Sequence, residues 1–291
     1  MSLEISLRAP LIACVSVAVL IAGIPGAVAK GKKKSPSVET LVGQLKDCES
    51  LETCPAVKGL KKYGKAVWPK LKVGFTAKDW KTRFWTLGVL SAMKLPAAVP
   101  EVGKMLAQDP HFRVRAAAAF ALGQLRSKVV TPYLLAAIKD KIGGVRFTVV
   151  VAMGRVKDPR TIPALIVTLR DREPEVRQYA LAALGDMKAK TAIPRILERL
   201  EQDLKPKIRA YAAMALSRIK DPRSVVPLRK RLTEEKNTKA LCAAIYALGE
   251  LQDKKSLPLI RGLAGHKDKE VRDYVADAVK KLSPKTAPAK K

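Results

Sequence analysis

Seven of the prolines recur at a nearly constant spacing of 31 to 33 residues. They are Pro69, Pro100, Pro132, Pro163, Pro194, Pro227 and Pro258. A fixed period of this size is typical of a repeat architecture, in which similar helical or sheet units stack one on the next. Proline inside a helix costs roughly 3 kcal/mol, but it costs little at the first helical position, where the N–H lacks a partner anyway. The spacing therefore predicts one helix per repeat, opened by the proline.

A second helix is predicted before each of these prolines. Its apolar residues recur at i, i+3, i+4 and i+7, which indicates an amphipathic helix, and no alternating pattern predicts a strand. We name this segment helix A and the proline-led segment helix B. Helix A begins at Val114-Arg115, Val145-Arg146, Val176-Arg177, Ile208-Arg209, Ala240-Leu241 and Val271-Arg272, with Thr82-Arg83 as a degenerate copy. A glycine recurs near its end, as in Leu122-Gly123 and Leu184-Gly185, which indicates either close backbone packing or the helix terminus.

These paired helices resemble HEAT-like repeats of the short bacterial type, also called phycobilisome-lyase-type, over roughly residues 78–282. The resemblance implies an all-α fold, a right-handed α-α superhelix (α-solenoid) of about six to seven helix pairs, with the B helices lining the concave face. It also implies hydrogen-bonded ladders between neighbouring repeats, formed by an aspartate and the arginine six residues later. The predicted ladder residues are Asp109, Arg115, Asp140, Arg146, Asp171, Arg177, Asp203 and Arg209. His266 replaces the aspartate before Arg272, so we expect the ladder to weaken in the last repeat.

The first 29 residues have the features of a secretory signal peptide. Arg8 precedes an apolar run from Leu11 to Ile24, and Ala27-Val28-Ala29 offers a small-residue cleavage pattern. The run is shorter than the ~20 residues of a membrane-spanning helix, although an uncleaved anchor and a lipoprotein signal at Cys14 are alternatives. We therefore predict an exported protein, periplasmic or extracellular. The predicted domains are a signal peptide (1–29), a basic linker (30–36), an N-terminal cap (37–77), the solenoid (78–282) and a disordered basic tail (283–291).

Three cysteines follow the leader. Cys48 and Cys54 flank a short polar loop, and in an oxidising compartment we expect them to form a disulfide. Their spacing and the lack of nearby histidine argue against zinc, so no metal site is predicted. Cys242 lies among Ala243, Ala244 and Ile245 of a helix A, where a buried, small apolar residue is expected.

The formal net charge of +30 predicts attraction to acidic proteins or polyanions. Only seven of the lysines lie in the linker and the tail, so most of the excess belongs to the folded part. One candidate surface is the edge formed by the turns between helices A and B: Arg126, Lys128, Lys157, Arg160, Lys188, Lys190, Lys220, Arg223, Lys254 and Lys255. The alternative is that these cations only complement helix C-termini, worth ~0.3–1 kcal/mol each.

A second candidate surface is helix B of the later repeats: Arg195, Arg199, Arg229, Lys230 and Arg261. Glutamates are interspersed there, so some of these cations are expected to form ordinary i,i+4 pairs. A third is a lysine- and tryptophan-rich segment near the N-terminus: Lys61, Lys62, Lys65, Trp68, Lys70, Lys72, Trp80 and Lys81. Aromatic and basic side chains together suit a polyanion, whereas bulky residues also serve to cap the end of a repeat stack. We favour the cap.

Catalytic interpretations have little support in the sequence. The two histidines, His111 and His266, lie in different repeats, and no H-E-x-x-H, G-x-S-x-G or P-loop pattern occurs. The repeated His-Glu pairs of HEAT-like iron hydroxylases are absent, and the resemblance to bilin lyases gives no residue to transfer. We therefore predict an exported, non-catalytic scaffold without a cofactor that binds an acidic protein partner. The alternatives are a polyanion binder (nucleic acid, lipopolysaccharide or anionic glycan) and a lyase-type maturation factor.

Overall fold

Helices are the only regular elements among residues 36–283, the part of the chain that the computed structural model describes. The predicted all-α class is therefore confirmed. The predicted signal peptide, almost all of the basic linker and the tail beyond residue 283 lie outside the described residues. Within residues 36–283, no helix combines the length and the apolar character needed to cross a membrane. The chain divides into two units, one ending at Ala98 and the other beginning at Val99.

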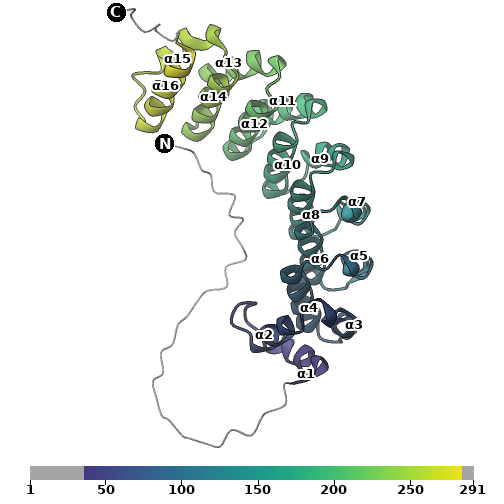
Figure 1. Cartoon of the computed structure of the whole chain (residues 1–291). Helices are drawn as coiled ribbons and strands as arrows, with labels where there is room; N and C mark the ends of the chain where they lie inside the picture. The colour runs from purple at the N-terminus through teal and green to yellow at the C-terminus, as the bar shows by residue number, and fades with distance from the viewer. Residues whose placement is uncertain (1–35, 284–291) are drawn as a thin grey trace, which may run out of the picture. The chain divides into compact units, whose positions relative to one another are not determined.

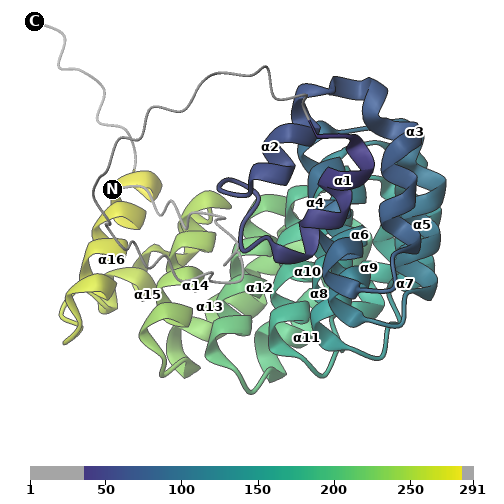
Figure 2. The same cartoon turned by 90° about the horizontal axis from the view of Figure 1, so that it is seen from below.

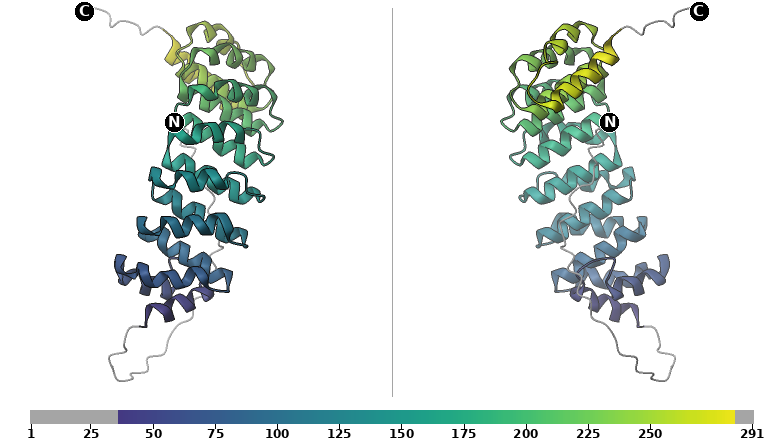
Figure 3. Two further views of the ribbon diagram at one scale, coloured as in Figure 1. Left: turned by 90° about the vertical axis from the view of Figure 1, so that its right-hand side faces the viewer. Right: turned by 90° about the vertical axis from the view of Figure 1, so that its left-hand side faces the viewer.

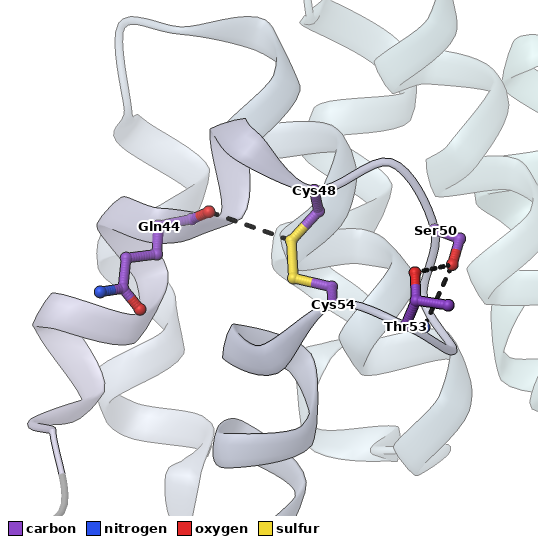
Figure 4. Close-up of a disulfide and its surroundings, with 5 residues drawn as sticks. All are labelled: Gln44, Cys48, Ser50, Thr53 and Cys54. Atoms are coloured by element: carbon purple, nitrogen blue, oxygen red, sulfur yellow. Dashed lines mark hydrogen bonds between the residues drawn. A yellow bond between two sulfur atoms is a disulfide. The ribbon is translucent and has the colours of Figure 1, made fainter. Parts of the chain in front are cut away.

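The first unit holds four α-helices joined by short 3₁₀ segments: α1 (Val38–Gly43), α2 (Pro55–Lys62), α3 (Trp68–Leu71) and α4 (Trp80–Met93). A disulfide joins Cys48 to Cys54, whose Cα atoms are 5.3 Å apart, as predicted (Figure 4). The loop between them packs on α4, since a Cβ atom at Gly88 would lie 2.7 Å from Leu51 Cδ2. Helix α4 thus belongs with the cap, and the units divide later than the boundary predicted at residue 77.

The second unit is a stack of six helix pairs in two rows (Figures 1 to 3). The inner row consists of α6 (Phe112–Gln124), α8 (Gly143–Val156), α10 (Pro174–Asp186), α12 (Pro206–Ile219), α14 (Thr238–Glu250) and α16 (Lys269–Leu282). The outer row consists of α5 (Val99–Gln108), α7 (Thr131–Ala137), α9 (Ile162–Thr168), α11 (Ile193–Gln202), α13 (Val225–Glu234) and α15 (Leu257–Gly262). The inner row corresponds to the predicted A helices and the outer row to the B helices.

The periodic prolines lie one or two residues later in their helices than predicted. Pro132 is the second residue of α7 and Pro227 is the third of α13, because a short 3₁₀ turn precedes each outer-row helix. The reason why proline is tolerated at these positions is the same as at the first helical position. The first four N–H groups of a helix have no partner within it, so proline removes no hydrogen bond at any of these positions.

The A helices, rather than the B helices, line the concave side of the second unit, which corrects the expectation drawn from the resemblance (Figure 1). Inner-row neighbours pack along their lengths, whereas outer-row neighbours barely meet. The recurring glycine explains the difference: a Cβ atom at Gly123 would lie 2.8 Å from Ala152 Cα, and one at Gly185 would lie 2.9 Å from Ala215 Cα. Because small residues let only the inner helices approach closely, the stack bends toward them.

Candidate functional site

The arginines at the head of the inner-row helices form the predicted ladder between repeats. Arg115 donates from Nε and Nη2 to the Asp140 carboxylate at 2.6 and 3.0 Å, and from Nη1 to the Asp109 carbonyl oxygen at 2.9 Å. The next two rungs have the same geometry: Arg146 with Asp171 at 2.6 and 2.7 Å, and Arg177 with Asp203 at 2.8 and 2.9 Å. These charges are mutually satisfied and buried, so they stabilise the stack and are not available to a partner.

A fourth rung, which the sequence analysis missed, uses glutamate in place of aspartate. Arg209 donates to both Glu235 oxygens at 2.7 Å. The ladder ends there, because the next inner-row helix carries Leu241 where the others carry arginine. At the aspartate position that follows, His266 Nδ1 accepts the Asp268 N–H at 3.1 Å and no rung forms, in agreement with the expected weakening.

Two of the predicted edge arginines are engaged in the turns themselves. Arg160 donates to Asp158 Oδ2 from Nε at 2.9 Å and from Nη2 at 2.6 Å, and Arg223 makes the same kind of two-bond pair with Asp221 at 2.9 and 3.0 Å. Arg160 holds the pKa of the Asp158 carboxyl far below its usual range, and Thr131 also donates to this carboxylate at 2.7 Å. Both arginines therefore stabilise their turns, and the paired aspartates largely compensate their charge.

The outer-row cations are also mostly paired. Arg195 and Arg199 both contact Glu198 at 2.6 Å, and Arg195, with smaller effects of Arg170 and Arg199, holds the pKa of Glu198 down at about 2. Arg229 makes a bidentate contact with Asp253 at 2.5 and 2.7 Å. Lys230 lies 3.7 Å from Glu234. Arg261 is exposed. The predicted helix B surface is therefore a convex face of alternating charge, with little free positive potential.

The remaining edge cations are exposed and, within the described residues, have no ion-pair partner. They are Arg126, Lys128, Lys157, Lys188, Lys190, Lys220, Lys254 and Lys255. Four of these eight share a feature that the sequence did not reveal: Arg126, Lys157, Lys188 and Lys220 have φ between 49° and 55°. This is the left-handed conformation that normally favours glycine or asparagine at the end of a helix. Each inner-row helix from α6 to α12 is thus followed by a cationic residue with a strained, left-handed backbone, once per repeat.

The lysine- and tryptophan-rich segment of the first unit surrounds an aromatic cluster. Trp68 packs on Phe75 with ring centroids 5.9 Å apart, and the Lys72 Nζ lies 5.1 Å from the Trp68 centroid. Trp68 and Trp80 are half-buried. The lysines at 61, 62, 65, 70, 72 and 81 are exposed around them. The rings fill the unit as a cap requires, and the lysines leave the surface strongly basic.

Comparison with known families agrees with this repeat geometry. The HEAT repeat family matches residues 99–171, 162–240 and 226–290, which together span the whole second unit. The chain belongs to the HEAT repeat family. Among the curated proteins none is similar to this HEAT-repeat protein.

Solved structures are similar to this HEAT-repeat protein in fold. The crystal structure of YibA from Escherichia coli has 22% sequence identity and a TM-score of 0.61, covering 87% of this chain and 99% of its own. An engineered protein has 17% identity and a TM-score of 0.53, covering 84% of this chain and 78% of its own. The CpcE–CpcF complex of phycocyanin lyase from Nostoc sp. PCC7120 has 25% identity over 52% of this chain and 98% of its own, with a TM-score of 0.44. At these identities the likeness shows the repeat fold alone.

Proposed function

We propose that this HEAT-repeat protein is a non-catalytic scaffold that binds an acidic protein partner through the turn edge. The observation that carries the proposal is the row of left-handed cations at Arg126, Lys157, Lys188 and Lys220. A left-handed backbone costs a residue with a Cβ atom roughly 1–2 kcal/mol, and glycine would avoid most of that cost. Retaining a cation there favours a role for its charge.

The edge is suited to electrostatic recognition because its geometry repeats. Lys157 and Lys220 both cap their helices in the same backbone conformation, so their side chains leave the stack in equivalent directions. Neighbouring helices in a packed row lie about 8–10 Å apart, which sets the spacing of the charges. Such a row steers an acidic surface toward the edge and fixes its alignment, while the paired cations elsewhere contribute little.

A pull-down with the mature protein from an extract of the cells that produce it tests the proposal. A triple variant, Lys157→Gln with Lys188→Gln and Lys220→Gln, removes three edge charges without touching the ladder. We expect the mature wild-type protein to retain an acidic protein in a pull-down and the variant to lose at least nine-tenths of it.

A matched control removes three exposed lysines from the opposite turns, those between outer-row and inner-row helices: Lys139→Gln, Lys236→Gln and Lys267→Gln. Both variants have the same net charge. Equal retention by the two triple variants would show that total charge, rather than the edge, governs binding, and would refute the assignment of the edge.

We also propose export to a periplasmic or extracellular compartment. The Cys48–Cys54 disulfide supports this proposal, since disulfides persist in oxidising compartments and are rare in the cytosol. Mass spectrometry of the purified native protein tests it. An N-terminus at Lys30 and no free thiol at either cysteine are expected, whereas an intact leader on a protein with reduced cysteines would contradict export.

A second candidate function is polyanion binding by the first unit. It is favoured by the exposed lysines around half-buried Trp68 and Trp80, together with the Lys72 contact to the Trp68 ring. Heparin affinity measured against salt tests this candidate. A polyanion site should weaken linearly in log salt and be reduced by Trp68→Ala with Lys72→Gln, whereas no retention at low salt would exclude it.

A further inference from the structure

The inner row carries a column of side chains whose charges alternate from repeat to repeat. The column lies near the end of the inner-row helices, ten residues after the residue at which the sequence analysis began each helix A. It consists of Gln124, Arg155, Asp186, Arg218, Glu250 and Lys281. Arg218 Nη1 lies 2.8 Å from Asp186 Oδ1, and Lys281 Nζ lies 2.5 Å from Glu250 Oε1. A carboxylate on one helix thus pairs with a cation on the next.

Arg155 is the cation of the first such pair, but its carboxylate is missing. The position one repeat earlier is Gln124, and among the described residues no carboxylate reaches the Arg155 guanidinium. Its Nη1 atom is shielded from solvent and has no hydrogen-bond partner. A guanidinium nitrogen that has lost its water without gaining an acceptor is costly, because a buried donor on a charged group keeps its full desolvation penalty.

The surroundings of Arg155 are aromatic and positive. Its guanidinium carbon lies 4.9 Å from the centroid of the Phe120 ring. Tyr179 of the next helix, stacked edge-to-face on Phe147 at 4.7 Å, is near enough to act on its charge. Burial, together with repulsion from the left-handed edge cation Arg126, lowers the pKa of Arg155. Arg155 therefore lies beside a second cation and aromatic rings, and among the described residues no carboxylate is paired with it.

We propose that Arg155 is the anchor for a carboxylate side chain of the acidic protein partner. The incoming Asp or Glu would take the place that Asp186 and Glu250 hold beside their own cations and would accept from the Arg155 guanidinium. Phe120 and Tyr179 would contact the apolar part of the same segment. The inference rests on the proposed function, because it names where that acidic partner is held on the inner row, next to the edge.

A carboxylate suits this site better than a polyanion does. A polyanion needs several uncompensated cations along its path, but along this column Arg218 and Lys281 are already neutralised by Asp186 and Glu250. An arginine fork with apolar flanks matches one planar carboxylate, which it can bind through two parallel hydrogen bonds. The concave face therefore selects a single acidic side chain within an otherwise apolar segment.

Two variants of the mature full-length protein test the inference in opposite ways, and the probe in anisotropy titrations is a fluorescein-labelled peptide that carries one glutamate among leucines and alanines. Arg155→Gln removes the anchor, and we expect Kd to rise at least tenfold. Gln124→Glu supplies the missing internal carboxylate, and we expect the same loss of affinity together with a higher Tm, because the introduced carboxylate pairs with Arg155 within the protein. The rise in Tm shows that the variant is folded.

Gln202→Glu, which adds the same charge on the exposed end of α11, is the matched control and should leave Kd within twofold. Asp186→Asn releases Arg218 and should lower Kd. The inference is overturned if Gln124→Glu and Arg155→Gln bind this single-glutamate peptide as the wild type does. If the edge triple variant alone loses binding, the proposed function stands and the anchor is rejected. If the wild type fails to bind, the acidic-partner function itself is rejected.

Discussion

Arg209 holds Glu235 by two hydrogen bonds of 2.7 Å, in the place where the preceding repeats hold an aspartate. The longer side chain fulfils both aspartate roles, since Glu235 Oε1 also accepts the Asn237 N–H at 3.0 Å, as Asp140 accepts that of Ile142 at 2.9 Å. Each carboxylate thus joins the arginine of one repeat to the backbone of the next. The ladder sets the register of the stack and leaves the remaining cations for other roles.

Breaking one rung should destabilise the protein strongly. Asp171→Asn leaves the buried Arg146 guanidinium without its counter-ion, and removing one partner of a buried pair costs about 3 kcal/mol. Asp273→Asn is the control, because Asp273 forms an exposed pair with Lys269 at 2.7 Å, which contributes at most ~0.5 kcal/mol. Urea unfolding of both variants measures the difference, and equal midpoints would show that the ladder does not support the fold.

Stability should fall in acid because of the same carboxylates. Burial alone would raise the pKa of Asp140, Asp171 and Glu235, but their hydrogen bonds to arginine and backbone N–H groups hold each pKa below its ordinary value. A group with a lowered folded pKa contributes stability above its unfolded pKa, about 4, and loses it as pH falls through the folded pKa. We therefore expect a constant Tm from about pH 7 to 5 and a steep decline below about pH 4. Asp171→Asn should show a shallower decline, and an unchanged slope would count against this origin.

One of the two best-defined features of the fold was predicted correctly and the other was not. The ladder was predicted because an aspartate and the arginine six residues later, such as Asp171 and Arg177, recur in successive repeats and resemble the Asp–Arg pairs of HEAT repeats. The concave side was predicted on the wrong row, although the glycines were the relevant signal: Gly123 and Gly185 show that the A helices approach closely.

The candidate site was predictable only in part. The edge lysines stand out by charge, but Lys157 gives no sequence sign of its left-handed backbone, because lysine is not a residue associated with positive φ. The Arg155 site depends on which side chains face each other across repeats. Asp186 and Arg218 are 32 positions apart, and only the inner-row geometry makes them a pair.

The glycine column predicts opposite effects for one substitution at two sites. Gly123→Ala would place a Cβ atom 2.7 Å from Ala152 Cβ, and overpacking of this kind costs about 1–3 kcal/mol. Gly249→Ala meets Ala278 Cβ at 3.6 Å, an ordinary contact, so the higher helix propensity of alanine should stabilise the protein by up to about 1 kcal/mol. Thermal unfolding of the two variants compares them. A Tm that moves in the same direction for both would contradict the packing explanation of the stack's curvature.

The left-handed cations should show a conflict between stability and binding. Lys157→Gly relieves the strain of a Cβ atom at φ 52°, and after the entropic cost of glycine we expect a gain of about 0.5–1 kcal/mol, together with weaker retention of the acidic partner. Lys128→Gly is the control: it removes the same charge from the same edge, but Lys128 lies in a 3₁₀ turn without positive φ, so stability should fall. Thermal unfolding and pull-down on both variants separate the two effects. If Lys157→Gly is more stable and still binds fully, the strained cation serves no purpose at this edge, and the main support for the proposed binding surface is lost.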